Sequence, residues 1–162
     1  MSKLDLTLPI EDGFLNVRVG AIIEKDGKVL MVGNNDFGYL YSVGGRVQFG
    51  ENTEQAVIRE VYEETGVKLE IDRLGYVHEN YFICDSPEKL GKLIYEICFY
   101  YFMKVPEEFS LIQHTFKDGG DEEYLQWVSM DTEKKIYPEF LKEELSHPAK
   151  EVKHIVTDER KG

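Results

Sequence analysis

Runs of apolar residues predict that the first third of this chain is built mainly of β-strands. Residues 18–23 and 28–32 are rich in β-branched and other apolar side chains. Residues 25–27, with the sequence KDG, form a hairpin signal between the two runs. Residues 39–47 predict a third extended segment, so the chain is expected to open with three neighbouring strands.

The second half of the chain has further strand-like runs. Residues 69–84 predict a strand or a pair of strands, and residues 85–92, which contain a proline and a glycine, predict a turn. Residues 93–104 are apolar at both alternating sets of positions, as in a strand covered on both faces. Another strand is predicted over residues 124–130, and a helix over residues 138–145 with proline in its first turn.

A longer helix is predicted between the two groups of strands. Asn52 or Thr53 is suited to be its N-cap, and Gly66 lies where a left-handed residue ends a helix. Its apolar residues at helical spacing are Ala56, Val57 and Val61. Strands on both sides of this helix, followed by a late helix, predict an α/β fold with a mixed sheet and helices on both faces.

The length of 162 residues predicts a single domain over residues 1–162, able to bury about 70% of its unfolded surface. We expect an ordered core over about residues 14–147. The segment after Pro148 is charged, and it is predicted to be a partly disordered tail.

The overall charge narrows the choice of partner. The chain has 19 basic and 31 acidic residues, a net charge of −12, which argues against a nucleic acid or an anionic membrane as partner. A polyphosphate substrate would also be repelled unless a cation lay between it and the protein. Cys84 and Cys98 lie in apolar runs and are expected to be unpaired thiols. With no signal peptide or membrane-length apolar run, we expect a cytoplasmic protein.

The predicted central helix carries a group of acidic residues that folding does not require. Glu60, Glu63 and Glu64 are spaced i, i+3 and i+4, so their carboxylates project from one face and repel one another. A hard divalent cation such as Mg²⁺, which prefers oxygen ligands, would reward this arrangement. Arg59 can pair with Glu63 or reach back to Glu51. The alternative is an ordinary solvated acidic helix face.

Residues 45–67, GRVQFGENTEQAVIREVYEETGV, match every position of the template G-x5-E-x7-R-E-U-x-E-E-x-G-U, where U is aliphatic. This segment resembles the Nudix box of the MutT-like Nudix hydrolases. The resemblance implies an α/β/α sandwich with a mixed sheet. It also implies a hydrolase that cleaves a diphosphate linkage in a nucleoside triphosphate, ADP-ribose or nucleotide sugar by water attack on phosphorus, with Mg²⁺ as cofactor and Mn²⁺ as a substitute.

The resemblance also assigns roles to individual residues. The catalytic set that it implies is Glu51, Arg59, Glu60, Glu63 and Glu64. Of these, the last three are the metal ligands, and Gly44 with Gly45 forms a tight loop whose backbone faces the metal. The general base is then Glu64 or an acid outside the box. A proline that many members have before the two glycines is absent here.

One candidate ligand lies outside the box. Residues 104–123 form a connection with little regular pattern, which is long for a compact domain. It ends in an acidic segment, where family members often supply another ligand or the base, and we select Glu122 for that role. The alternative is a solvated loop end.

Four residues are candidates for substrate contacts. Glu96 is the only charged residue of its apolar run, so it needs a partner or a place at an opening. Arg18 is a candidate phosphate contact, or else an ordinary strand-end charge. Tyr39 and Tyr41 precede the two glycines and could stack on a base, although aromatic residues in strands usually belong to the core.

The remaining sequence features are less informative. Of the four histidines, which show no metal-ligand spacing, His78 is the only one that could face a site. A homodimer is common in the family, and no pattern here requires one. The alternative to an enzyme is a module that binds a nucleotide metabolite without cleaving it, although such proteins often lack box glutamates that are intact here.

Overall fold

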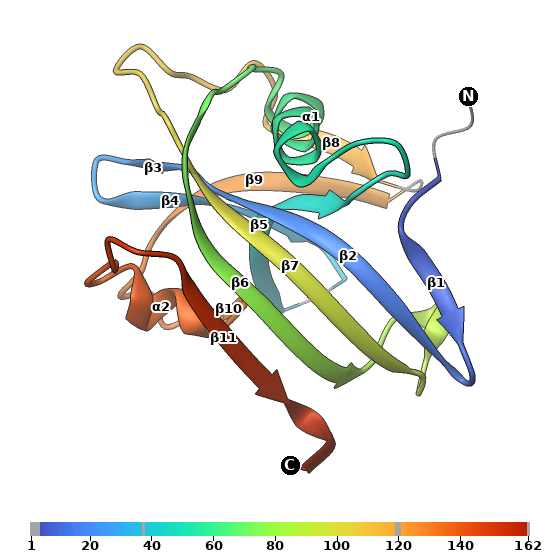
Figure 1. Ribbon diagram of the computed structural model, residues 1–162. Coiled ribbons are helices and arrows are strands. Elements are labelled where there is room, and N and C mark those ends of the chain that lie inside the picture. The colour runs from blue at the N-terminus through green and yellow to red at the C-terminus, as the bar shows by residue number, and fades with distance from the viewer. Residues whose placement is uncertain (1–3, 37, 119–120, 162) are drawn as a thin grey trace.

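The computed structural model describes residues 4–36, 38–118 and 121–161, and its strands form one twisted sheet (Figure 1). The strands are β1 (Thr7–Ile10), β2 (Gly13–Ile22), β3 (Glu24–Lys25), β4 (Lys28–Asn34), β5 (Tyr39–Arg46), β6 (Ile71–Ile83), β7 (Leu93–Met103), β8 (Thr115–Asp118), β9 (Asp121–Ser129), β10 (Lys135–Tyr137) and β11 (Lys153–Asp158). The α-helices are α1 (Thr53–Thr65) and α2 (Phe140–Glu144), and two 3₁₀ turns are η1 (Pro87–Lys89) and η2 (Glu159–Lys161).

The sheet is mixed, as predicted. Its main order is β11-β6-β7-β2-β5-β4-β9-β8. The pairs β2–β7, β6–β11 and β5–β10 are parallel, whereas β6–β7, β2–β5, β4–β5 and β4–β9 are antiparallel. Strand β7 contributes Tyr101 and Met103 to one hydrophobic core and Cys98 and Tyr100 to another, which explains why its sequence is apolar at both alternating sets of positions.

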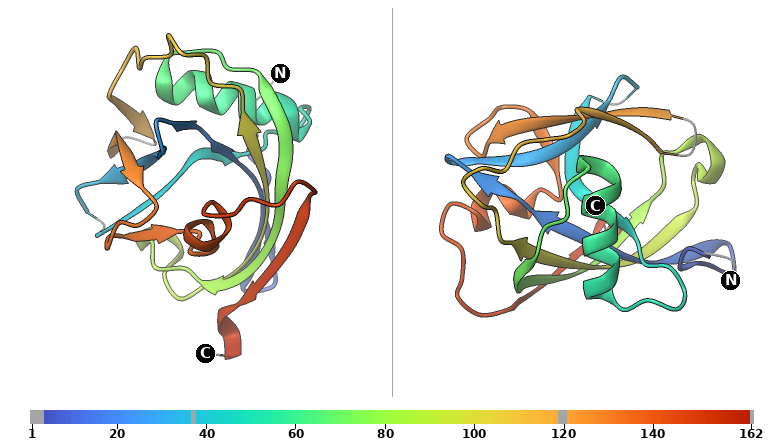
Figure 2. Two further views of the ribbon diagram at one scale, coloured as in Figure 1. Left: turned by 90° about the vertical axis from the view of Figure 1, so that its left-hand side faces the viewer. Right: turned by 90° about the horizontal axis from the view of Figure 1, so that it is seen from above.

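The two helices cover opposite faces of the sheet, and the left view of Figure 2 shows the curved sheet between them. One hydrophobic core joins Ala56, Val57 and Val61 of α1 to the sheet. A second core, on the other face, contains Leu141 and Leu145 at the end of α2. The predicted α/β/α arrangement is therefore confirmed.

Local signals set the ends of α1 and of the first hairpin. Asn52 is the N-cap: its side chain accepts the N–H of Gln55, whose side chain in turn accepts the N–H of Asn52. Gly66 ends the helix with a φ of 79°. In the hairpin between β3 and β4, Asp26 and Gly27 have φ values of 52° and 77°, the left-handed pair that a two-residue turn requires.

Three expectations need correction. The segment after Pro148 is not simply a tail, because β11 adds to the edge of the sheet beside β6 over six residue pairs. The connection over residues 104–123 contains β8, which pairs with β9, so only its first part is irregular. The late helix begins at Phe140, two residues after Pro138, rather than at the proline. Within the described residues, no helix has the length and apolar character needed to cross a membrane.

Candidate active site

The guanidinium of Arg59 organises the acidic residues of α1. Its Nε and Nη2 donate to the two carboxylate oxygens of Glu51 at 3.0 and 2.7 Å. Its Nη1 donates to Glu60 at 2.8 Å and to Glu63 at 3.2 Å, and Nη2 also donates to the carbonyl of Arg46 at 3.0 Å. Both pairings predicted for Arg59 are therefore present. Burial opposes the charge of Arg59, but its hydrogen bonds with Glu51 and Glu60 outweigh that effect and raise its pKa.

The two glycines of β5 bring the sheet close to these carboxylates. A Cβ on Gly45 would lie only 2.5 Å from the carboxylate of Glu60, so a side chain there would displace that carboxylate. The N–H of Gly44, whose φ is 152°, donates to Oε2 of Glu64 at 3.0 Å. Both glycines are strand residues in register with β2, not a tight loop as expected, because β5 continues to Arg46.

The three box glutamates on α1 differ strongly in their surroundings. Glu64 is 6% exposed, whereas 54% of the Glu63 side chain is exposed. Glu60 lies between these extremes, and burial raises its pKa although Arg59 partly offsets the effect. The three carboxylates project from one helix face, as their spacing predicted, but they are buried to different extents.

A group of several carboxylate oxygens is the type of ligand set that a hard divalent cation prefers. In the described part of the chain, however, no three Asp, Glu, His or Cys side chains converge closely enough to enclose a metal ion. Nη1 of Arg59 donates to both Glu60 and Glu63 and supplies positive charge to both carboxylates. Glu63 lies on the surface, where it pairs with Nη1 of Arg59, and the carboxylate of Glu60 occupies the place that a Cβ on Gly45 would need.

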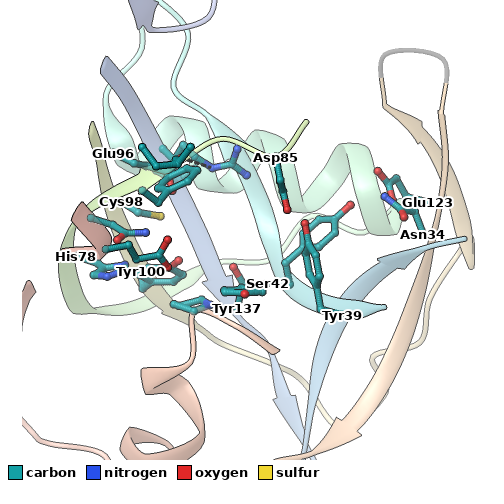
Figure 3. A pocket seen from close by; sticks show the side chains of 18 of the residues that line it. Asn34, Tyr39, Ser42, His78, Asp85, Glu96, Cys98, Tyr100, Glu123 and Tyr137 are labelled. Atoms are coloured by element: carbon teal, nitrogen blue, oxygen red, sulfur yellow. Dashed lines mark ion pairs between the residues drawn. The ribbon is translucent and has the colours of Figure 1, made fainter. Parts of the chain in front are cut away.

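A cavity of about 650 Å³ lies on the face of the sheet opposite α1. The four predicted substrate residues, Arg18, Tyr39, Tyr41 and Glu96, all line it although they come from three different strands. Figure 3 shows His78, Cys98 and Tyr100 at one end and Asn34 and Glu123 at the other, with Tyr39 between them. The structure therefore brings together residues that the sequence could only nominate singly.

An ion pair lies in the wall of this cavity. Nε of Arg18 lies 3.7 Å from Oε1 of Glu96, and Nδ2 of Asn16 donates to the same oxygen at 3.5 Å. Burial opposes the charge of Arg18, but Glu96 and other acidic neighbours, including Glu60, raise its pKa overall. The direct partner of the Arg18 guanidinium is therefore Glu96 on β7.

Aromatic rings form the middle of the cavity. The ring of Tyr39 packs edge-on against Tyr137 at a centroid distance of 4.8 Å, and Tyr41 lies 6.5 Å away. Burial, followed by the nearby charge of Asp85, raises the pKa of Tyr39 to about 12, so its hydroxyl stays protonated at neutral pH. The arrangement offers apolar ring surface beside hydrogen-bonding groups, as small-molecule sites commonly do.

The acidic residue of β9 that enters the cavity is Glu123, which is 6% exposed. Glu122, selected from the sequence, is exposed to solvent, and its role as a metal ligand stays a prediction. Successive strand residues point to opposite faces, and nothing in the acidic run itself showed which one would face inward. Asn34 and Asp85 also line the cavity and carried no recognisable signal in the sequence.

Comparisons with known proteins agree with this geometry. The model of the NUDIX domain family matches residues 14–152. A MutT-like protein of Streptomyces ambofaciens is 38% identical over 61 residues, or 38% of this chain and 40% of the relative. An ADP-ribose pyrophosphatase of Methanocaldococcus jannaschii is 48% identical over 67 residues, 40% of each protein. The aligned region thus spans only two fifths of these relatives.

Solved structures resemble the whole fold. A MutT protein from Bacillus halodurans superposes with a TM-score of 0.62 at 18% identity, covering 82% of each chain. An ADP-ribose pyrophosphatase from Streptococcus suis gives a TM-score of 0.55 at 18% identity, covering 87% of this chain and 98% of that one. At these identities the likeness concerns the fold alone.

Proposed function

This chain belongs to the NUDIX domain family, and from that premise we propose that it is a metal-dependent hydrolase acting on a diphosphate linkage. The substrate is a nucleoside diphosphate derivative: a nucleoside triphosphate, ADP-ribose or a nucleotide sugar. Water attacks one phosphorus and the diphosphate is split. The observation that carries the proposal is the Arg59-centred group of box carboxylates, placed beside Gly45.

The proposed ligands are Glu60, Glu63 and Glu64, with the backbone of Gly44 beside them. Mg²⁺ bound by such a set, or Mn²⁺ in its place, supplies charge neutralisation and lowers the pKa of a bound water. Glu51 and Arg59 hold the carboxylates in position, and the bidentate contact between them makes that support rigid.

The chain's own groups then orient the reaction. Glu64, fixed by the N–H of Gly44 and shielded from solvent, is our leading candidate to accept the proton of the attacking water. If the base lies outside the box, Glu123 is the better-shielded acid of β9, whereas Glu122 is in solvent. Arg18, held by Glu96, is the cation placed to contact a phosphate at the cavity mouth.

Two features favour a nucleotide with a bulky second group. The cavity of about 650 Å³ offers aromatic surface from Tyr39, Tyr41 and Tyr137, on which a base can stack. The similarity over 67 residues to an ADP-ribose pyrophosphatase is a reason to test ADP-ribose first.

Nucleic acid and anionic membranes are not expected partners, because the net charge is −12.

The test is a phosphate-release screen with Mg²⁺ or Mn²⁺ and a coupled phosphatase that reveals monophosphate products. The panel contains nucleoside triphosphates, ADP-ribose, nucleotide sugars and dinucleoside polyphosphates. We expect a hit that is abolished by a chelator and by Glu64→Gln. Binding of a nucleotide in calorimetry, with no turnover under any metal, would instead identify a module that binds without cleaving.

A further inference from the structure

The C-terminal strand β11 reaches the cavity from outside the region that the family model covers. The family match ends at residue 152, and β11 begins at Lys153. Thr157 of β11 lies opposite Asn80 of β6, and Nε2 of His78 is 2.8 Å from the hydroxyl of Thr157. Glu159, just after β11, lines the same cavity as His78 and Asn80. The end of the chain therefore completes one wall of the cavity.

A chain of hydrogen bonds fixes the tautomer of His78. The hydroxyl of Thr157 donates its single hydrogen to Oδ1 of Asn80 at 2.7 Å. That hydroxyl can therefore only accept at its contact with Nε2 of His78, so Nε2 carries the proton. The lone pair is then on Nδ1, for which no hydrogen-bond partner is found in the described parts of the chain.

The surroundings of His78 keep the ring neutral. His78 is 5% exposed and packs edge-on against Phe140 of α2 at a centroid distance of 4.9 Å. Burial lowers its pKa to about 4, so near neutral pH the ring is an uncharged acceptor. A histidine in this state neither attracts phosphate nor repels a neutral ligand.

The rest of the cavity wall is also rich in acceptors. Its acidic side chains are Asp85, Glu88, Glu96, Glu123 and Glu159, and among the described lining residues Arg18 is the one lysine or arginine. Arg18 is already engaged by Glu96. At the His78 end, a wall with so many acceptors favours an uncharged group that brings N–H or O–H donors.

We propose that the His78 end of the cavity is a subsite for a hydrogen-bond donor on the uncharged part of the substrate, either a sugar hydroxyl or an exocyclic amino group. Nδ1 of His78 accepts the hydrogen bond and determines specificity. Thr157 is a positioning residue, which acts by holding His78 in the Nε2–H tautomer. The inference rests on the proposed function, since it assigns part of the same substrate.

The tautomer is testable without any activity. NMR of ring-¹⁵N-labelled protein should show His78 protonated at Nε2 and unprotonated at Nδ1. Thr157→Val, which keeps the shape but loses the hydroxyl, should shift His78 toward a mixture of tautomers. Val156→Thr is the matched control, because Val156 is the neighbouring residue on β11 and is 61% exposed. An Nδ1–H tautomer in the unaltered protein would overturn the proposal.

Calorimetry in the presence of Ca²⁺ then measures nucleotide binding. Two pairs of ligands are compared, ADP-ribose with ADP and GTP with ITP. The comparison identifies which group of the ligand donates the hydrogen bond to His78. Thr157→Val and His78→Phe should weaken one member by about tenfold, the scale of one lost hydrogen bond. Loss confined to ADP-ribose identifies a sugar hydroxyl, and loss confined to GTP identifies an amino group.

The possible failures are distinguishable. If the unaltered protein binds nucleotides and Thr157→Val weakens all of them no more than Val156→Thr does, the subsite is wrong while the proposed function survives. If no nucleotide binds or is cleaved, the subsite fails together with the proposed function, whatever tautomer is found.

Discussion

The acid cluster on α1 and the cavity on the opposite face of the sheet are assembled from very different stretches of sequence. Glu51, Arg59, Glu60 and Glu63 lie within one segment, and the contacts of Arg59 join residues no more than thirteen positions apart. In the cavity, the contact between His78 and Thr157 joins residues 79 positions apart. The first region is set mainly by helix geometry, and the second by the register of the sheet.

This difference suggests that the acid cluster carries out the reaction and that the cavity selects the substrate. Helix spacing fixes the separations of Arg59, Glu60, Glu63 and Glu64, which suits a reaction that must be repeated unchanged. The cavity wall depends on seven strands and their connections, so single substitutions there can change its chemistry without touching the box. Substitutions in each region test whether catalysis and substrate selection can be changed separately.

The largest effect is expected from Glu64→Gln. The amide keeps an oxygen that can accept the N–H of Gly44 but loses the negative charge, so turnover should fall by about 10³-fold or more with the fold retained. The measurement is kcat with the best substrate of the screen, alongside a thermal melt. Glu54→Gln, an exposed acid of the first turn of α1, is the matched control. If the single variants Glu64→Gln and Glu63→Gln both kept full activity, the proposed ligand set would be refuted.

The next prediction concerns how the free energy of unfolding depends on pH through His78, which lines the cavity. The pKa of His78 in the folded protein is about 4, below its ordinary value of 6.5. The unfolded chain therefore binds the proton more readily, so the stability that neutral His78 contributes is full above pH 6.5 and is lost as pH falls toward 4. The loss is about 3 kcal/mol across that window. Urea titrations at several pH values measure it, and His78→Gln should lack this part of the slope. Parallel pH profiles would show that His78 is not buried as described.

A somewhat smaller loss of activity is expected when the carboxylate of Glu60 is displaced from its place beside β5. In Gly45→Ala, the new Cβ would lie 2.5 Å from the carboxylate of Glu60, which must move. A displacement of this kind should reduce kcat by about 10²-fold, with little change in KM if the cavity is independent. Gly38→Ala is the control, since a Cβ there meets nothing within 4 Å. A large rise in KM would instead show that box and cavity are coupled.

The smallest effect should follow the loss of one aromatic ring from the cavity. Tyr39→Leu removes the edge-on contact with Tyr137 and the ring on which a base could stack. We expect KM to rise by up to about tenfold while kcat is preserved. Tyr62→Leu, on the exposed side of α1, is the control. An equal fall in kcat would mean that Tyr39 also orients the reacting diphosphate.

The sequence alone determined the parts of this protein that depend on near neighbours. The N-cap at Asn52, the end at Gly66 and the spacing of Glu60, Glu63 and Glu64 are local, because a helix fixes the separation of residues a few positions apart. The apolar periodicity similarly predicted most strands, since it reports burial on one face or two. The family resemblance followed from the same segment.

Only the tertiary structure decided how distant strands meet. It selected Glu123 rather than Glu122 as the acid inside the cavity, brought Arg18 to Glu96, and turned the expected tail into β11 beside His78. Each outcome depends on strand register, where a shift of one residue moves every side chain to the other face. Between strands that are distant in the chain, this register is decided by packing in the folded protein, because no turn joins them directly.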